Sequence, residues 1–279
     1  MADTYFLNFR GPGGAVCDPY LLRGDGAPPP PATAPALSIV QWSEVPALVG
    51  GRSILFYTHG FNVSYQGGAE SLELVARYLN LAAPYLFIGM LWPGDGGVPF
   101  VDYPWEGGPA LDSGRRLATF CNTWCNGAQS LSFASHSLGA RMVLQAVAGL
   151  AAPRKARVLC LMAGAINRDC LVTQYASAAA KSERIAVLAS HGDDVLKLAF
   201  PPGDAVADQI YDDHTPQAAL GYDGPPPPAA GVTAPWQIAD REGFGHLDYM
   251  PPNDNNKWQW AVDFVRRNFF GQPLIWPTP

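Results

Sequence analysis

The chain has 279 residues, of which 48% are hydrophobic and 15% charged, and its formal net charge is −6. This composition excludes a disordered chain and supplies enough apolar material for one large domain whose sheet is buried on both faces. Because Lys and Arg are scattered and form no basic block, we expect no nucleic-acid partner.

Neither a leader nor a membrane span is expected from the sequence. The chain begins MADTYFLNFR, with no basic stretch before a long apolar run, and its most apolar stretch, residues 79–92, is too short to cross a bilayer. We therefore expect a cytoplasmic protein without membrane insertion. The cysteines have no C-x-x-C spacing, which fits neither a disulfide framework nor a structural zinc site and favours free, mostly buried thiols; they are Cys17, Cys121, Cys125, Cys160 and Cys170. We expect no metal and no cofactor.

Short apolar runs alternate with longer segments of helical period. Strands are predicted at residues 53–58, 86–92, 131–134, 157–162 and 185–190, and helices at 69–81, 110–124, 138–150 and 257–270. Such alternation is typical of strand-helix units, so we predict an α/β fold with a mostly parallel central sheet and helices on both faces. A single domain over residues 1–279 is expected, in which residues 1–50 form an N-terminal extension with a Pro-rich loop.

The segment SHSLG, residues 135–139, lies between a predicted strand and a predicted helix. A small-x-Ser-x-Gly turn in this context makes a nucleophile elbow, because the sharp turn tolerates only small residues at its two ends. Ser135 and Gly139 meet that demand, and Ser137 becomes the candidate nucleophile. The alternative is that Ser137 only caps the following helix.

A His-Gly pair follows the first predicted strand, in the segment His59-Gly60-Phe61-Asn62. Hydrolases with a nucleophile elbow place an oxyanion donor at such a position, and the residue after the nucleophile supplies the second. We assign these two backbone N–H donors to Phe61 and Leu138. The alternative for the pair is a loop glycine beside a packed histidine.

The acid and the base should follow the nucleophile in chain order. The strand at residues 185–190 leads directly to Asp193 and Asp194, of which Asp193 is preferred, although either aspartate can cap the next helix. Of the later histidines, His246 in GFGHLDY is preferred as base over His214, which lies in the polar loop sequence YDDHTP. His136 and His191 are interpreted as packing or hydrogen-bonding residues.

Taken in order, the segments HGFNV (59–63), LWP (91–93), SHSLG (135–139), SHGD (190–193) and GH (245–246) resemble a bacterial α/β-hydrolase domain family of unknown function. The resemblance covers about residues 51–250. It implies an α/β-hydrolase fold and a lipase- or esterase-like activity, with Ser137 as nucleophile, Asp193 as acid and His246 as base. Ser135 departs from the Gly that many hydrolases have there, and the Pro-rich insertion at residues 201–235 is long and is expected to reshape the pocket over the active site.

The expected reaction is hydrolysis of a small-molecule carboxylic ester through an acyl-enzyme. Pocket-lining candidates are His59, Gly60, Phe61, Trp92, Tyr103, Trp105 and the 201–235 insertion, whose apolar groups favour a hydrophobic substrate portion. Two alternatives stay open: acyl transfer by the same three residues, and a binding protein on a hydrolase scaffold. The sequence leaves the oligomeric state open.

Overall fold

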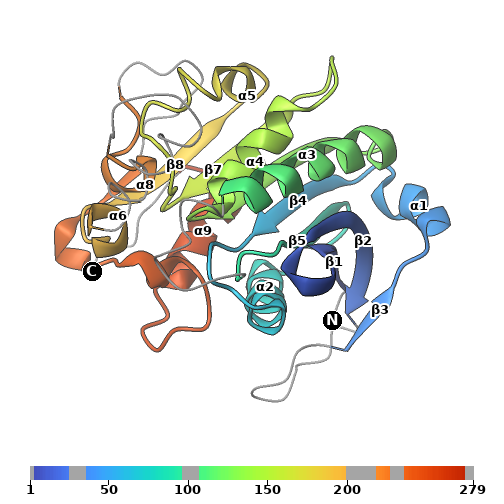
Figure 1. Ribbon diagram of the computed structural model, residues 1–279, viewed down its shortest axis with the longest axis horizontal. Coiled ribbons are helices and arrows are strands. Elements are labelled where there is room, and N and C mark those ends of the chain that lie inside the picture. Colours follow the sequence, from blue (N-terminus) through green and yellow to red (C-terminus); the bar gives the residue numbers. More distant parts are fainter. Residues whose placement is uncertain (1–2, 25–35, 96–106, 199–217, 227–235, 274–279) are drawn as a thin grey trace.

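The computed structural model describes residues 3–24, 36–95, 107–198, 218–226 and 236–273. Within these ranges the strands form a nine-stranded sheet in the order β3-β2-β1-β5-β4-β6-β7-β8-β9 (Figure 1). Neighbouring strands pair in parallel along the part of the sheet that runs β1-β5-β4-β6-β7-β8-β9. At the other end, β2 pairs antiparallel with both β1 and β3. The bounds are β1 Thr4–Arg10, β2 Val16–Gly24, β3 Leu37–Ile39, β4 Ser53–Thr58, β5 Tyr85–Leu91, β6 Ser130–His136, β7 Ala156–Met162, β8 Ile185–Ser190 and β9 Trp236–Ile238.

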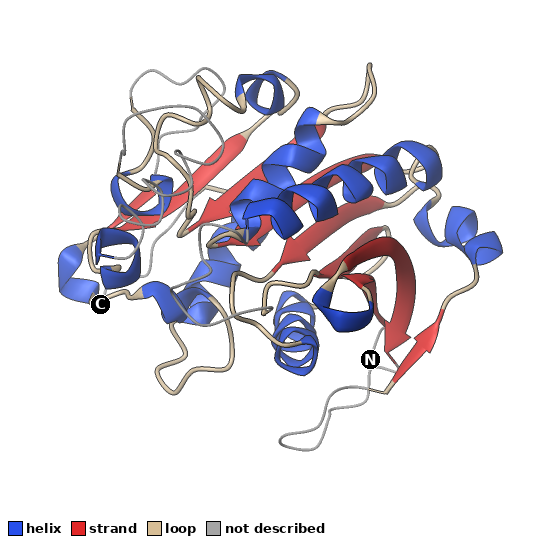
Figure 2. Ribbon diagram, in the orientation of Figure 1, coloured by secondary structure: helices blue, strands red, loops and turns tan. Residues whose placement is uncertain are grey.

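Helices cover both faces of the sheet (Figure 2). Apolar side chains of α1, α3, α4 and α5 enter one hydrophobic core, and those of α2, α6 and α9 enter the other. The predicted mostly parallel α/β sheet with helices on both faces is therefore confirmed. The helices are α1 Val45–Val49, α2 Tyr65–Leu79, α3 Gly107–Trp124, α4 Gly139–Ala148, α5 Ala176–Ala180, α6 Asp194–Leu198, α8 Leu220–Asp223 and α9 Trp258–Phe270.

Helix α2 shows how local sequence fixes an element next to the site. The Ser64 hydroxyl accepts a hydrogen bond from the Gly67 N–H at 3.1 Å and so caps the start of the helix. At the other end Asn80 adopts a left-handed conformation with φ 45°, which stops the helix. Leu72, Val75 and Leu79 lie between these ends at helical spacing and are buried against the sheet.

The segment predicted to be an N-terminal extension supplies β1, β2 and β3, and β1 pairs directly with β5. In β1, Leu7 and Phe9 enter the core on one face of the sheet and Phe6 the core on the other. Successive apolar residues whose side chains point to opposite faces are the signal of a strand buried on both faces. The expectation of an extension outside the sheet is therefore wrong for these three strands. The Pro-rich part of residues 1–50 lies outside the described residues.

No helix in the described part of the chain combines the length and the apolar character needed to cross a membrane.

Candidate active site

Ser137 occupies the turn between β6, which ends at His136, and α4, which begins at Gly139. Its φ is 54°, in the left-handed region that costs a residue with a Cβ about 1–2 kcal/mol. Backbone hydrogen bonds hold this conformation: the Ser137 N–H donates to Met162 at 3.0 Å, and the Ser137 carbonyl accepts from Ala165 at 3.2 Å. The elbow is therefore fixed by contacts with the adjacent strand β7 and the residues that follow it.

Two glycines let the loop after β4 approach this turn. A Cβ on Gly139 would lie 2.6 Å from the His59 carbonyl oxygen, and a Cβ on Gly60 would lie 2.8 Å from the Cβ of Ser137. Neither distance is possible for real side chains, so both positions require glycine. The close approach is made by Gly60, the residue before the predicted oxyanion donor Phe61, and Phe61 lines the same cavity as Ser137. Leu138 occupies the position immediately before α4.

His246 reaches Ser137 from the distant loop between β9 and α9. Its Nε2 lies 2.8 Å from Ser137 Oγ, and its Nδ1 lies 2.8 Å from Asp193 Oδ2. Because an ionised carboxylate only accepts hydrogen bonds, Nδ1 carries the proton and donates to Asp193, which leaves Nε2 as the acceptor for the serine hydroxyl. The three residues form one hydrogen-bonded chain.

Asp193 is fully buried and serves two partners. Its Oδ2 faces the imidazole, and its Oδ1 accepts a hydrogen bond from the Leu196 N–H at 2.9 Å at the start of α6. One carboxylate thus both contacts the imidazole and caps the start of α6. The neighbouring Asp194 is exposed as the first residue of α6, and the structure brings Asp193 to His246.

His136 ties the elbow to the histidine loop. Its Nε2 donates to the His246 carbonyl at 2.9 Å, and its ring packs on Tyr249 with centroids 5.7 Å apart and 25° between the planes. Burial, reinforced by the nearby His246, holds the pKa of His136 well below its ordinary value. His136 is therefore a neutral structural donor, which fits the hydrogen-bonding role expected from sequence.

His59 is buried beside the elbow, where its Nδ1 donates to the Gly60 carbonyl at 2.8 Å. Burial lowers the pKa of His59 to about 4, so the ring is neutral at pH 7. Trp92, predicted from sequence to contact the substrate, has no exposed surface. It stacks on His59 with centroids 5.7 Å apart and donates from Nε1 to the His59 carbonyl at 3.1 Å, so Trp92 supports the loop behind the cavity and does not line it.

Arg10, at the end of β1, supports the same loop and was missed in the sequence. One of its guanidinium nitrogens donates to the Val63 carbonyl, and another lies 2.5 Å from Asp95 Oδ1. The Asn62 N–H in turn donates to the Gly94 carbonyl at 2.6 Å. The signal for Arg10 was the nearly continuous apolar run within residues 4–10, which indicates a buried strand and places its last residue at the carboxyl edge of the sheet.

A cavity of about 560 Å³ opens beside Ser137 and His246. The side chains of Asp, Glu, Lys and Arg are absent from its lining in the described part of the chain. Its apolar lining comes from Phe61, Val63, Ala165, Val195, Leu196, Leu247, Met250, Pro251 and Pro252. Leu247, directly after the base candidate, is 76% exposed at the rim. A second hollow, of about 650 Å³, lies at the opposite edge of the sheet beside Ser53 and Ser130 and is lined mainly by polar groups.

Some residues weighed from sequence are not described by the structure, and others are not part of the site. Tyr103, Trp105 and His214, together with residues 201–217 and 227–235 of the predicted insertion, fall outside the described residues. All five cysteines are free thiols, and all but Cys17 are buried, as predicted. Among the described residues, no three His, Cys, Asp or Glu side chains converge as a metal site would require.

A mostly parallel sheet with helices on both faces and a serine elbow between β6 and α4 defines an α/β hydrolase. The chain belongs to the family of alpha/beta hydrolases of unknown function (DUF900), which matches residues 48–205. The resemblance inferred from the motifs is thus confirmed. No curated protein shows a significant sequence match to the chain.

Solved structures include distant likenesses. The ydeN gene product from B. subtilis is 15% identical, with a TM-score of 0.46 over 79% of this chain and 100% of that one. An esterase from Pyrobaculum calidifontis is 12% identical, with a TM-score of 0.45 over 97% of this chain and 86% of that one. Esterase 2 from Thermogutta terrifontis is 11% identical, with a TM-score of 0.41 over 83% and 87% of the two chains. The family membership rests on the match over residues 48–205 and not on these likenesses.

Proposed function

We propose that this protein is a serine hydrolase that cleaves carboxylic esters of uncharged small molecules through an acyl-enzyme. The observation that carries the proposal is the hydrogen-bonded chain from Ser137 through His246 to Asp193, at the mouth of an apolar cavity. Acyl transfer to a serine requires a nucleophile, a base within hydrogen-bond reach and a buried group that orients the base.

In the first half of the reaction, the Ser137 hydroxyl attacks the ester carbonyl as His246 Nε2 accepts its proton. The buried Asp193 carboxylate, 2.8 Å from Nδ1, stabilises the imidazolium that forms. The backbone N–H groups of Phe61 and Leu138 are the proposed donors to the oxyanion. His246 then gives its proton to the departing alcohol, which leaves the acyl group on Ser137.

In the second half, a water molecule replaces the alcohol. His246 Nε2 takes a proton from the water as its oxygen attacks the acyl carbonyl, and returns that proton to Ser137 Oγ as the acid departs. The electrically neutral form of His246 is needed at the start of each half, and the 2.8 Å contact with Ser137 supports its role in both.

The cavity supports the choice of substrate class. Its described lining carries no charged side chain to pair with a charged substrate, and its apolar groups gain free energy by covering hydrocarbon. A volume of about 560 Å³ accommodates an ester with an acyl chain of several carbons. We therefore expect kcat/KM to rise with acyl length from acetyl to a medium-length chain.

The test is hydrolysis of p-nitrophenyl esters of increasing acyl length, measured for the wild type and for Ser137→Ala. We expect turnover by the wild type and a loss of at least about 10³-fold in the variant. Added alcohols report whether water or another acceptor receives the acyl group. A folded wild type that cleaves none of the esters, or a Ser137→Ala variant as active as the wild type, would overturn the proposal.

A further inference from the structure

The loop that carries His246 has little regular structure of its own. Between β9 and α9 it contains two short 3-10 helices, η3 (Asp240–Glu242) and η4 (His246–Tyr249), with the imidazole on the first residue of η4. A segment of this kind presents a side chain with fixed geometry only when contacts from elsewhere hold its backbone. The described residues contain such contacts on both sides of His246.

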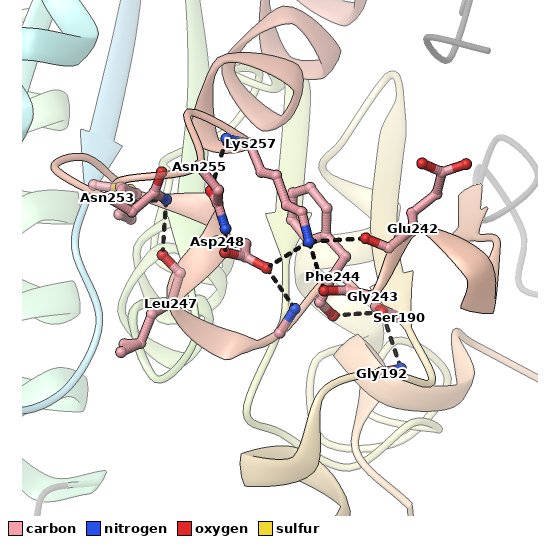
Figure 3. Close-up of polar contacts among 12 residues, drawn as sticks. Ser190, Gly192, Glu242, Gly243, Phe244, Leu247, Asp248, Asn253, Asn255 and Lys257 are labelled. Atoms are coloured by element: carbon pink, nitrogen blue, oxygen red, sulfur yellow. Dashed lines mark hydrogen bonds and ion pairs between the residues drawn. The ribbon is translucent and has the colours of Figure 1, made fainter. Parts of the chain in front are cut away.

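Lys257, immediately before α9, provides three of them (Figure 3). Its Nζ donates to the Glu242 carbonyl at 2.8 Å and to the Gly243 carbonyl at 2.6 Å, and it lies 3.5 Å from Asp248 Oδ2. An ammonium group has three donors, and these three acceptors match that number. Glu242 and Gly243 precede His246 in the chain and Asp248 follows it, so one ammonium joins the two sides of the turn.

Asp248 carries this link to the residue next to the imidazole. Its Oδ2, which faces Lys257, also accepts a hydrogen bond from the Gly245 N–H at 2.7 Å. Its Oδ1 accepts from Asn255 Nδ2 at 2.7 Å. The peptide group between Phe244 and Gly245, one residue before His246, is therefore oriented by a carboxylate that the ammonium holds in place. We call Lys257 with Glu242, Gly243, Gly245 and Asp248 the Lys257 clasp.

A separate contact, which does not involve Lys257, anchors the His246 loop to the rest of the protein. Ser190 Oγ donates to the Phe244 carbonyl at 2.7 Å and accepts from the Gly192 N–H at 3.1 Å, which joins the loop to the segment before Asp193. Phe244 is fully buried and packs edge-on against Tyr249, with ring centroids 4.7 Å apart. Loss of the ammonium should therefore loosen the turn while the chain stays folded.

We propose that Lys257 is a positioning residue for His246: the clasp sets the backbone from which the imidazole reaches both Ser137 and Asp193. The inference rests on the proposed function of His246 as general base. Two hydrogen bonds of 2.8 Å define the position of the ring, and an angular error in the turn lengthens one of them. A misplacement of about 1 Å can cost about 10²-fold in rate.

The kinetic test compares Lys257→Met, which keeps an apolar stem but no donor, with Lys257→Arg, which restores donors. Lys155→Met is the matched control, since Lys155 is exposed just before β7 at the opposite edge of the sheet. We expect Lys257→Met to lower kcat by about 10-fold with KM changed by less than about twofold, because the loss is in orientation and not in substrate binding. Lys257→Arg should recover part of the loss, and Lys155→Met should match the wild type.

Two further measurements separate positioning from general destabilisation. In a His246→Ala background, Lys257→Met should not reduce the residual rate of ester cleavage, because the clasp acts through the imidazole. Hydrogen exchange of the 242–248 amides should be faster in Lys257→Met than in the wild type and unchanged in Lys155→Met. An unchanged kcat in Lys257→Met, an equal loss in the His246→Ala background, or unchanged exchange would each overturn the proposal. If the wild type cleaves no ester, the proposed function fails, and the exchange measurement alone decides whether the clasp holds the loop.

Discussion

The nucleophile elbow and the histidine loop meet at one site, but they are built in different ways. The elbow is a single turn between a buried strand and a helix, held by backbone hydrogen bonds to the neighbouring strand β7 and shaped by glycines at positions 60 and 139. The histidine loop is irregular, and side chains hold it: His136, Ser190 and Lys257 each bind one or more of its carbonyl groups. Geometry at Ser137 is thus set by the sheet, whereas geometry at His246 is set by polar contacts.

This difference explains why the two sides should respond differently to substitution. A change in the elbow forces backbone out of a packed sheet, which resists deformation. A change in the loop removes one polar contact among several and leaves the others in place. Substitutions in the two regions therefore test this comparison. The first is at the buried Asp193, which contacts His246.

The largest effect is expected for Asp193→Asn. The amide keeps an oxygen that can accept from Leu196, so the start of α6 survives, but it no longer fixes Nδ1–H as the proton-bearing nitrogen or balances an imidazolium charge. We expect a loss of about 10³-fold in kcat/KM for p-nitrophenyl esters. The exposed Asp194 provides the matched control, and Asp194→Asn should stay within about twofold of the wild type. Equal losses in the two variants would contradict the assignment of Asp193.

A smaller effect is expected on the elbow side for Gly60→Ala. The added Cβ would lie 2.8 Å from the Cβ of Ser137 and 3.0 Å from His136 Nδ1, so the loop must move away from the nucleophile. Displacement of the proposed oxyanion donor at Phe61 should lower kcat by about 10²-fold. In the control Gly127→Ala, the nearest atom would be 3.5 Å away, and activity should not change. An unaltered kcat in a folded Gly60→Ala variant would show that the close approach is not needed.

A further effect is expected on stability, through His59. Because burial lowers the pKa of His59 to about 4, the unfolded chain takes up a proton between pH 6.5 and pH 4 that the folded chain does not. The free energy of unfolding should therefore fall by up to about 3 kcal/mol from this residue as the pH drops through that window. The lowered pKa of His136 acts in the same direction.

Urea unfolding at pH 7 and at pH 4.5 measures this pH dependence in the wild type and in two variants. His59→Gln removes the titrating ring and should lose part of the difference between the two pH values. His191→Gln, at an exposed histidine, should retain it. An identical pH dependence in the wild type and His59→Gln would show that His59 does not contribute.

The contrast between the two regions also decides what the sequence could predict. The strands at residues 53–58 and 185–190 were predicted with the bounds of β4 and β8, because continuous apolar runs between turn residues determine them. The elbow at Ser137 could also be predicted, because a short local pattern of small residues around a serine specifies this turn. His246 was chosen by chain order, and its supports Lys257 and Ser190 were not found. Arg10, which supports the loop after β4, was not found either, because all three residues act through contacts between residues far apart in the chain.

Two features of the fold differ from the sequence prediction. The strands β1 to β3 were treated as an extension, although Phe6, Leu7 and Phe9 form the nearly continuous apolar run of a strand buried on both faces. Trp92 was predicted to line the pocket because it ends a predicted strand at the carboxyl edge. Its side chain instead turns into the core and stacks on His59, a direction that neighbouring residues determine and local sequence does not.

The most direct test of the proposal that His246 activates Ser137 is labelling with a fluorophosphonate probe. Mass spectrometry of the peptide that contains Ser137 then locates the label. The probe reacts with a serine only when a nearby base activates its hydroxyl. We predict one label on Ser137 in the wild type. In His246→Ala, whose fold should be intact by circular dichroism, we expect labelling to be slower by at least about 10²-fold. A folded wild type that takes up no label, or equal labelling of the two proteins, would contradict the proposal.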